Sequence, residues 1–159
     1  MDYFYISGRS MEPILRKKKD IVVIENAKIA DIKLGDIIAF YNKNEEMIEE
    51  KTNIICHRVI KIKGNQLIEK GDLYLSSSIV NDKNYIGRVR YILRNNKKQD
   101  MTWLKWKMFN RLIAYCSRVS LWIISIKKKA KFYKMQTLDL HHKGCLYYFE
   151  NALLKLMRV

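Results

Sequence analysis

The stretch Ile54-Ile55-Cys56-His57-Arg58-Val59-Ile60-Lys61-Ile62 is rich in β-branched residues, which favour a β-strand. Lys63-Gly64-Asn65 follows it with turn residues, and Gln66-Leu67-Ile68-Glu69 then predicts a second strand. This succession of strand, turn and strand indicates that the chain is built mainly from β-structure.

The same pattern recurs through the first hundred residues. Turn residues or polar loops separate four further predicted strands, at residues 3–6, 20–25, 37–41 and 86–93. Many short strands with turn signals between them predict a mainly β fold, either an antiparallel β-barrel or a sandwich.

Beyond residue 100 the apolar spacing becomes helical. Residues 101–134 predict a helix with a broad apolar surface and a narrow basic stripe, and residues 146–157 predict a second helix. The sequence thus suggests a β domain over residues 1–95 and a basic helical region over residues 96–159. The net charge of +15 follows this division, since residues 1–100 carry a net +5 and residues 101–159 a net +10.

Composition limits the class of protein. Hydrophobic residues make up 48% of the 159 positions, enough for a core, so wholesale disorder is not expected. Three cysteines without paired spacing favour free thiols in a reducing compartment. The first residues lack the pattern of a signal peptide, and the uncharged run at residues 119–126 is far shorter than the roughly 20 residues of a bilayer span. We therefore expect a cytoplasmic protein.

Three short segments carry candidate chemistry. Ser7-Gly8-Arg9-Ser10-Met11-Glu12-Pro13, Cys56-His57-Arg58-Val59 and Lys70-Gly71-Asp72 supply a serine, a histidine and an aspartate, each beside a predicted strand. Acyl-transfer catalysis uses these residue types as nucleophile, general base and orienting group. We therefore predict Ser10 as the nucleophile and His57 as its base.

These segments resemble the signal peptidase I superfamily. Its serine box, Gly-x-Ser-Met-x-Pro before an apolar pair, is matched by Gly8-Arg9-Ser10-Met11-Glu12-Pro13-Ile14-Leu15. His57-Arg58-Val59 stands where the lysine branch has Lys-Arg-Val, so the chain is most similar to the histidine branch, that of the endoplasmic-reticulum-type enzymes. The likeness covers about residues 3–93, and the chain differs from typical signal peptidases in leaving no room for an anchor helix before Ser10.

The resemblance implies a partly open antiparallel β-barrel of signal-peptidase type, here with C-terminal α-helices. It implies a serine endopeptidase that cuts a leader, signal or propeptide segment after small residues, without a metal or other cofactor. Asp72 matches the Gly-Asp box, and Asp82 matches the acidic segment that follows it in the histidine branch. One of these two aspartates would orient His57. Gly8 and Met11 would lie at the oxyanion and substrate positions.

Each assignment has a structural alternative. His57 could cap a half-buried strand, Met11 could pack in the core, and Gly-Asp is also a common turn dipeptide. At the level of the whole protein, two alternatives are a self-cleaving peptidase of the repressor type and a catalytically silent, membrane-associated scaffold. The soft ligands in His141-His142-Lys143-Gly144-Cys145 lack an obvious fourth partner for zinc, so we expect no metal site.

The basic helical region has three possible partners. Residues 101–134 could contact an anionic membrane peripherally, at its cytoplasmic face, with Trp103, Trp106 and Trp122 at the headgroup level. They could instead pack on the β domain or on a partner protein. Nucleic acid is not expected, because apolar surface dominates over basic surface and no nucleic-acid-binding motif accompanies it.

Overall fold

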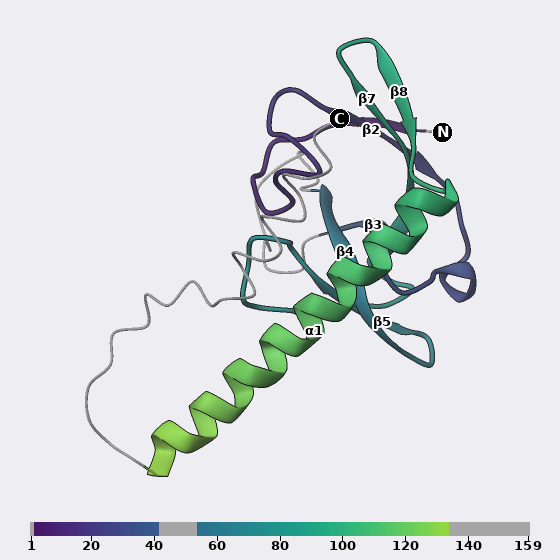
Figure 1. The fold of residues 1–159 in the computed structure, drawn as a ribbon. Coiled ribbons are helices and arrows are strands. Elements are labelled where there is room, and N and C mark those ends of the chain that lie inside the picture. Colours follow the sequence, from purple (N-terminus) through teal and green to yellow (C-terminus); the bar gives the residue numbers. More distant parts are fainter. Residues whose placement is uncertain (1, 42–53, 134–159) are drawn as a thin grey trace, which may run out of the picture.

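The computed structural model describes residues 2–41 and 54–133, with side chains described up to residue 126. It contains eight strands, a short 3₁₀-helix at Ile29–Asp31 and one long C-terminal helix (Figure 1). The elements are β1 (Asp2–Tyr5), β2 (Ile21–Glu25), β3 (Ile37–Tyr41), β4 (Ile54–Lys63), β5 (Gln66–Lys70), β6 (Ser78–Val80), β7 (Tyr85–Arg94), β8 (Lys97–Asp100) and α1 (Leu104–Tyr133).

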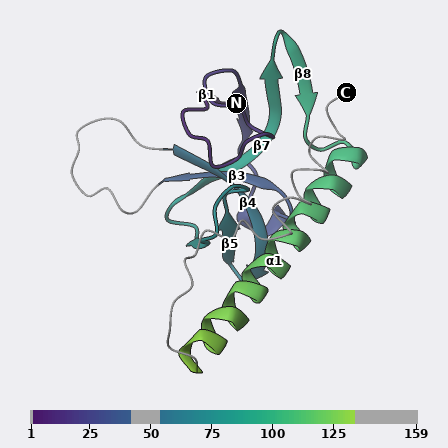
Figure 2. The same ribbon diagram turned by 60° about the vertical axis from the view of Figure 1, so that its left-hand side comes forward.

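The strands form one antiparallel sheet in the order β1-β2-β7-β3-β4-β5-β6, with β8 paired to β7. The sheet curls but stays open, because β1 and β6 end the order without pairing to each other (Figures 1 and 2). The prediction of a mainly β fold with an antiparallel, partly open sheet is confirmed at this level. The second predicted helix, at residues 146–157, lies outside the described residues.

Two strands were not predicted from the sequence. β6 has only three residues and follows a serine-rich loop, so its Ile79 and Val80 are too short a run to indicate a strand, and every residue of β8 is polar. β8 forms because Asn95 and Asn96 adopt positive φ angles of 49° and 60°, which suit a two-residue turn between antiparallel strands. A turn, rather than strand propensity, therefore creates this last hairpin.

Apolar side chains pack on both faces of the sheet. On β3, Ile37 and Ala39 belong to one buried cluster, while Ile38 and Phe40 belong to another. Side chains alternate between the two faces of a strand, so β3 separates the two clusters. The first cluster also includes Met11 and Leu15 from the turn after β1, which fixes that turn against the sheet.

Helix α1 contributes to the same core. Phe109 and Ile113 are buried in the first cluster, and the N-terminal half of α1 lies beside β4 (Figures 1 and 2). The contact is close at Gly35, where a Cβ atom would lie 2.7 Å from the backbone nitrogen of Arg111. Gly35 also has a φ of +92°, a conformation that other residues rarely adopt. No described helix is long and apolar enough to cross a membrane.

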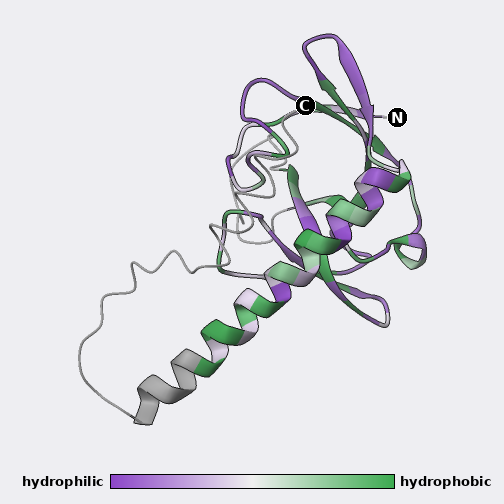
Figure 3. Cartoon of the chain, viewed as in Figure 1, coloured by the Kyte–Doolittle hydropathy of each residue, from purple (hydrophilic) through white to green (hydrophobic). Residues whose placement is uncertain are grey.

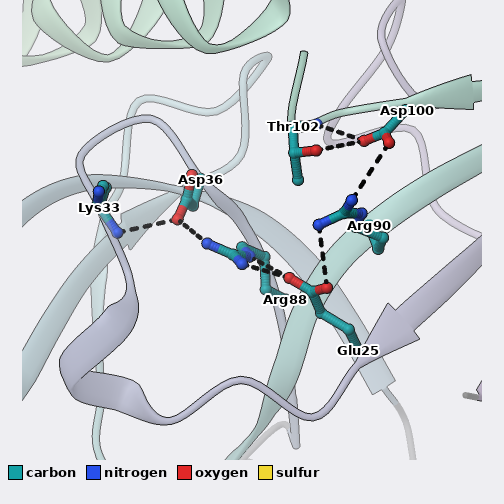
Figure 4. A network of polar contacts seen from close by, with 7 residues as sticks. All are labelled: Glu25, Lys33, Asp36, Arg88, Arg90, Asp100 and Thr102. Atoms are coloured by element: carbon teal, nitrogen blue, oxygen red, sulfur yellow. Dashed lines mark hydrogen bonds and ion pairs between the residues drawn. The ribbon is translucent and has the colours of Figure 1, made fainter. Parts of the chain in front are cut away.

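A network of charged groups holds β2, β7 and the loop before β3 together (Figure 4). The Arg88 guanidinium bonds to both Glu25 and Asp36, and the backbone N–H of Lys33 donates to Asp36 at 2.9 Å. Arg90 pairs with Asp100, although their separation of 3.4 Å makes this contact weaker. Burial by itself raises the pKa of the Asp100 carboxyl. Hydrogen bonds from Thr102 and the positive charge of Arg90 outweigh this effect, so the pKa of Asp100 is lowered. This network is structural and lies apart from the serine box.

Candidate active site

Ser10 and His57 meet although 47 positions separate them in the sequence. Ser10 lies in the turn after β1, and His57 lies in the middle of β4. The distance between Ser10 Oγ and His57 Nε2 is 2.9 Å, a hydrogen bond. This is the contact that a serine nucleophile needs with its general base.

Backbone hydrogen bonds across and directly after Ser10 stabilise the turn that carries it. The Glu12 N–H donates to the Arg9 carbonyl at 3.0 Å, and Leu15, which is fully buried, donates to the Met11 carbonyl at 3.0 Å. The Glu12–Pro13 peptide bond in this turn is cis. The apolar residues after Ser10 therefore anchor the turn in the core and leave the serine hydroxyl partly exposed.

A third residue, Glu69 of β5, completes the site. Its Oε2 lies 2.5 Å from His57 Nδ1, and its Oε1 accepts a hydrogen bond from the Ser78 hydroxyl on β6. A carboxylate that accepts a hydrogen bond from Nδ1–H keeps the proton on that nitrogen, so that Nε2 can accept the proton of the Ser10 hydroxyl. The geometry is thus that of a nucleophile, a base and an orienting carboxylate in line.

The imidazole ring of His57 is also packed from two sides. The Phe40 ring contacts it edge-on at a centroid distance of 5.8 Å, and the Tyr74 ring does so at 6.2 Å. Only 9% of the His57 surface is exposed. Aromatic packing and the Glu69 carboxylate together hold the ring in one orientation.

Asp72 does not orient His57, contrary to the expectation from its sequence motif. Its two carboxylate oxygens accept hydrogen bonds from Nε and Nη2 of Arg58, both at 2.8 Å. Arg58 is fully buried and also donates to Asn110 Oδ1 at 2.8 Å and to the Gly35 carbonyl at 3.2 Å. Side chains at successive strand positions point to opposite faces, so the partner of Arg58 lies across the sheet from His57. Asp72 therefore balances the buried charge of Arg58, whose burial was not predicted from the sequence.

Asp82 is also placed away from His57. It is exposed, and its carboxylate accepts a hydrogen bond from the side-chain amide of Asn65. β6 runs antiparallel to β5, so that Ser78 pairs with Glu69 and Val80 with Leu67. The chain after β6 consequently runs toward the β4–β5 turn, at the end of β5 remote from Glu69.

Glu69 was not predicted as a site residue, although the alternation of side chains in its strand indicated that it is buried. Leu67 and Glu69 stand two positions apart in the predicted strand and share a face, and both are buried. A carboxylate on the inward face of a strand next to the histidine strand needs a polar partner. That alternation, rather than a family motif, would have indicated the residue that contacts His57.

Gly71 packs directly against the two catalytic candidates. A Cβ atom at this position would lie 2.9 Å from Ser10 Cβ and 3.0 Å from His57 Nε2. The next residues hold this loop in place, because the Leu73 N–H donates to the Ser10 carbonyl at 2.9 Å. The Lys70-Gly71-Asp72 segment thus supports the site through the close approach of Gly71, as well as through Asp72.

We expect Gly71→Ala to lower the rate of reaction at Ser10 by about 100-fold, because the added methyl group separates Ser10 from His57. The measurement is the rate at which a small serine-directed phosphonate modifies the protein. Gly64→Ala is the matched control, since in the β4–β5 turn the same methyl group strains a positive φ but meets no atom within 4 Å. Equal rates for the two variants would show that the space beside Gly71 does not matter.

A cavity of about 210 Å³ adjoins Ser10 and His57. Its lining is largely apolar and comes from the end of β1, the serine turn, the start of β4 and the loop after β5: Phe4, Tyr5, Ile6, Ser7, Gly8, Ser10, Met11, Leu15, Ile54, Ile55, Cys56, His57 and Tyr74. Gly8 and Met11, which were predicted at the oxyanion and substrate positions, both line this cavity. Met11 is also 2% exposed and belongs to the core, so it borders the cavity and packs against the sheet at once.

Cys56 also borders the cavity but is not equipped as a nucleophile. Burial raises the pKa of its thiol to about 12, so the thiol stays protonated at neutral pH. Within residues 2–41 and 54–126, no group of three or more His, Cys, Asp or Glu side chains could hold a metal ion. The His141–Cys145 segment lies outside the described residues.

No match to this chain was found among protein-family models, curated proteins or solved structures.

Proposed function

We propose that the protein is a serine endopeptidase with Ser10 as nucleophile, His57 as general base and Glu69 as the orienting carboxylate. The observation that carries the proposal is the line of contacts from Ser10 Oγ to His57 Nε2, at 2.9 Å, and from His57 Nδ1 to Glu69, at 2.5 Å. Three residues from three separate elements meet in this line beside an open cavity, which favours catalysis over a capping role for His57.

The chemistry follows from these contacts. Ser10 Oγ attacks the carbonyl carbon of the substrate peptide bond while His57 Nε2 takes the hydroxyl proton. Glu69 stabilises the imidazolium that forms, and His57 then gives the proton to the leaving amine. Water, activated by the same histidine, hydrolyses the acyl-enzyme and frees Ser10.

The proposed substrate is a leader, signal or propeptide segment cut after small residues. The serine box and the His57-Arg58-Val59 segment support this choice through their resemblance to the signal peptidase I superfamily. The cavity beside Ser10 is compatible with it, because its mostly apolar lining suits small uncharged side chains better than charged ones.

A peptide library tests this proposal. We expect the purified protein, in detergent or with lipid vesicles, to cut peptides after small residues, as identified by mass spectrometry. The same library incubated with Ser10→Ala protein should contain none of these cuts. A folded wild-type protein that neither cuts the library nor reacts with a serine-directed phosphonate would contradict the proposal and favour the silent scaffold.

We expect Glu69→Gln to lower kcat/KM for a library-derived peptide by about 1,000-fold, because a neutral amide no longer fixes the tautomer of His57 or stabilises its cation. Ser78→Ala removes the second partner of the Glu69 carboxylate and should cost roughly tenfold or less. Thermal unfolding of both variants provides the control for folding. Full activity of the Glu69→Gln protein would exclude this carboxylate from the catalytic group.

A further inference from the structure

Helix α1 carries an apolar stripe that the protein leaves exposed. The stripe repeats every three or four residues, which places its members on one side of the helix, and each of them is exposed: Leu104, Met108, Leu112, Tyr115, Val119, Trp122 and Ile126. We call this set the outer stripe. Figure 3 shows hydrophobic residues along the described length of the helix.

The outer stripe lies opposite the side of α1 that packs on the sheet. Phe109, Asn110, Ile113 and Ser117 are buried, and at 100° per residue their mean direction is about half a turn from that of the outer stripe. No described side chain after Ser117 is buried, and this half of the helix extends past the sheet (Figures 1 and 2). The fold thus fixes one side of α1 and presents the other to its surroundings.

The charge of α1 has a single sign. The helix contains eight Lys or Arg residues and no Asp or Glu. Lys107, Arg111 and Arg118 are exposed along one border of the outer stripe, and Lys105 is exposed along the other. The Arg118 guanidinium lies over the Tyr115 ring at 5.9 Å from its centroid, so a basic group lies directly against the apolar stripe.

These features distinguish among the possible partners. A second copy of α1 would meet the apolar stripe but would bring like charges together on both borders. Nucleic acid would match the positive charge, but two leucines, a valine and an isoleucine of the stripe would stay exposed to water without an apolar partner. An anionic bilayer matches both, since acyl chains accept the apolar stripe and acidic headgroups accept the lysines and arginines.

We propose that the outer stripe of α1 binds the surface of anionic lipid bilayers and lies in the interface parallel to the membrane plane. The helix enters with its apolar side, Trp122 lies at the headgroup level, and the basic border contacts lipid phosphate. This inference does not depend on the proposed peptidase activity, and it is tested by binding alone.

Sedimentation of the full chain with lipid vesicles tests the inference. We expect vesicles that contain phosphatidylglycerol to bind the protein at least about tenfold more tightly than vesicles of phosphatidylcholine alone, with the difference reduced by salt. The variant Leu112→Gln/Trp122→Gln should weaken binding at least about tenfold, because two large apolar side chains are lost from the contact. Neither side chain is buried, so the fold should be unaffected.

The matched control is Ile62→Gln/Ile79→Gln, which removes two exposed apolar side chains from β4 and β6. This variant should bind vesicles as the wild-type protein does. Equal binding by the two double variants, or no preference for phosphatidylglycerol, would overturn the inference. A dimer in solution that Leu112→Gln/Trp122→Gln converts to a monomer, without vesicle binding by the wild type, would overturn it too and assign the stripe to a second copy.

Discussion

Ser10→Ala and His57→Ala are each expected to lower kcat/KM for peptide cleavage by at least about 10⁴-fold. The reason is that the hydroxyl and the imidazole act as one unit through their 2.9 Å contact, so the loss of either removes the attacking alkoxide. For the same reason the double variant should lose no more than either single variant. Steady-state kinetics on a peptide selected from the library provides the measurement.

Ser7→Ala is the control for this experiment. Ser7 is exposed and lines the same cavity, but the base contacts Ser10 instead. We expect this variant to keep its activity within about threefold of the wild type, since no catalytic contact changes. If Ser7→Ala were as inactive as Ser10→Ala, the nucleophile would have been assigned to the wrong serine.

Asp72→Ala is expected to reduce the free energy of unfolding by about 3–5 kcal/mol, because it leaves the guanidinium of Arg58 buried without its counter-charge. Both groups are nearly inaccessible to water, with side-chain exposures of 0% for Arg58 and 3% for Asp72. Denaturation in urea, followed by circular dichroism, measures the change. A loss of this size is a large part of the roughly 5–15 kcal/mol that stabilises a typical domain, so reduced activity alone would not reveal the role of Asp72.

Two further variants distinguish this structural role from a catalytic one. Asp82→Ala, at an exposed carboxylate, should change stability by less than about 0.5 kcal/mol. Arg58→Met/Asp72→Leu should recover much of the stability lost in Asp72→Ala, because replacing both partners removes the unpaired charge. A stable but inactive Asp72→Ala protein would return Asp72 to the catalytic group.

The strands that carry the site could be predicted, whereas the contact between them could not. Ile54–Lys63 and Gln66–Lys70 are visible as strands because their apolar residues have β propensity. Which acidic residue reaches His57 depends on the register of β4 and β5, and this register shifts at an irregularity between Val59 and Lys61. A β-bulge of this kind changes which side chains face one another and leaves no clear mark in the sequence.

In the helical region, the helix could be predicted from the sequence, but the division of its apolar surface could not. The spacing predicted an apolar surface on residues 101–134, and α1 does cover Leu104–Tyr133. The sequence did not reveal that this surface divides into a buried side, with Phe109 and Ile113, and the exposed outer stripe. Apolar residues on two sides of one helix appear in a sequence as a single broad face, and only the position of the sheet separates them.

The contacts between α1 and the sheet have a consequence for the smallest part of the chain that can fold alone. Asn110 bonds to Arg58, the neighbour of His57, and Ser117 bonds to Lys70, the neighbour of Gly71. A chain cut after residue 100 would lose these partners and the apolar side of the helix that covers the core. The part of the chain that can fold alone therefore extends at least to Ser117, and the same helix that we propose to bind lipid is also part of the interior of the protein.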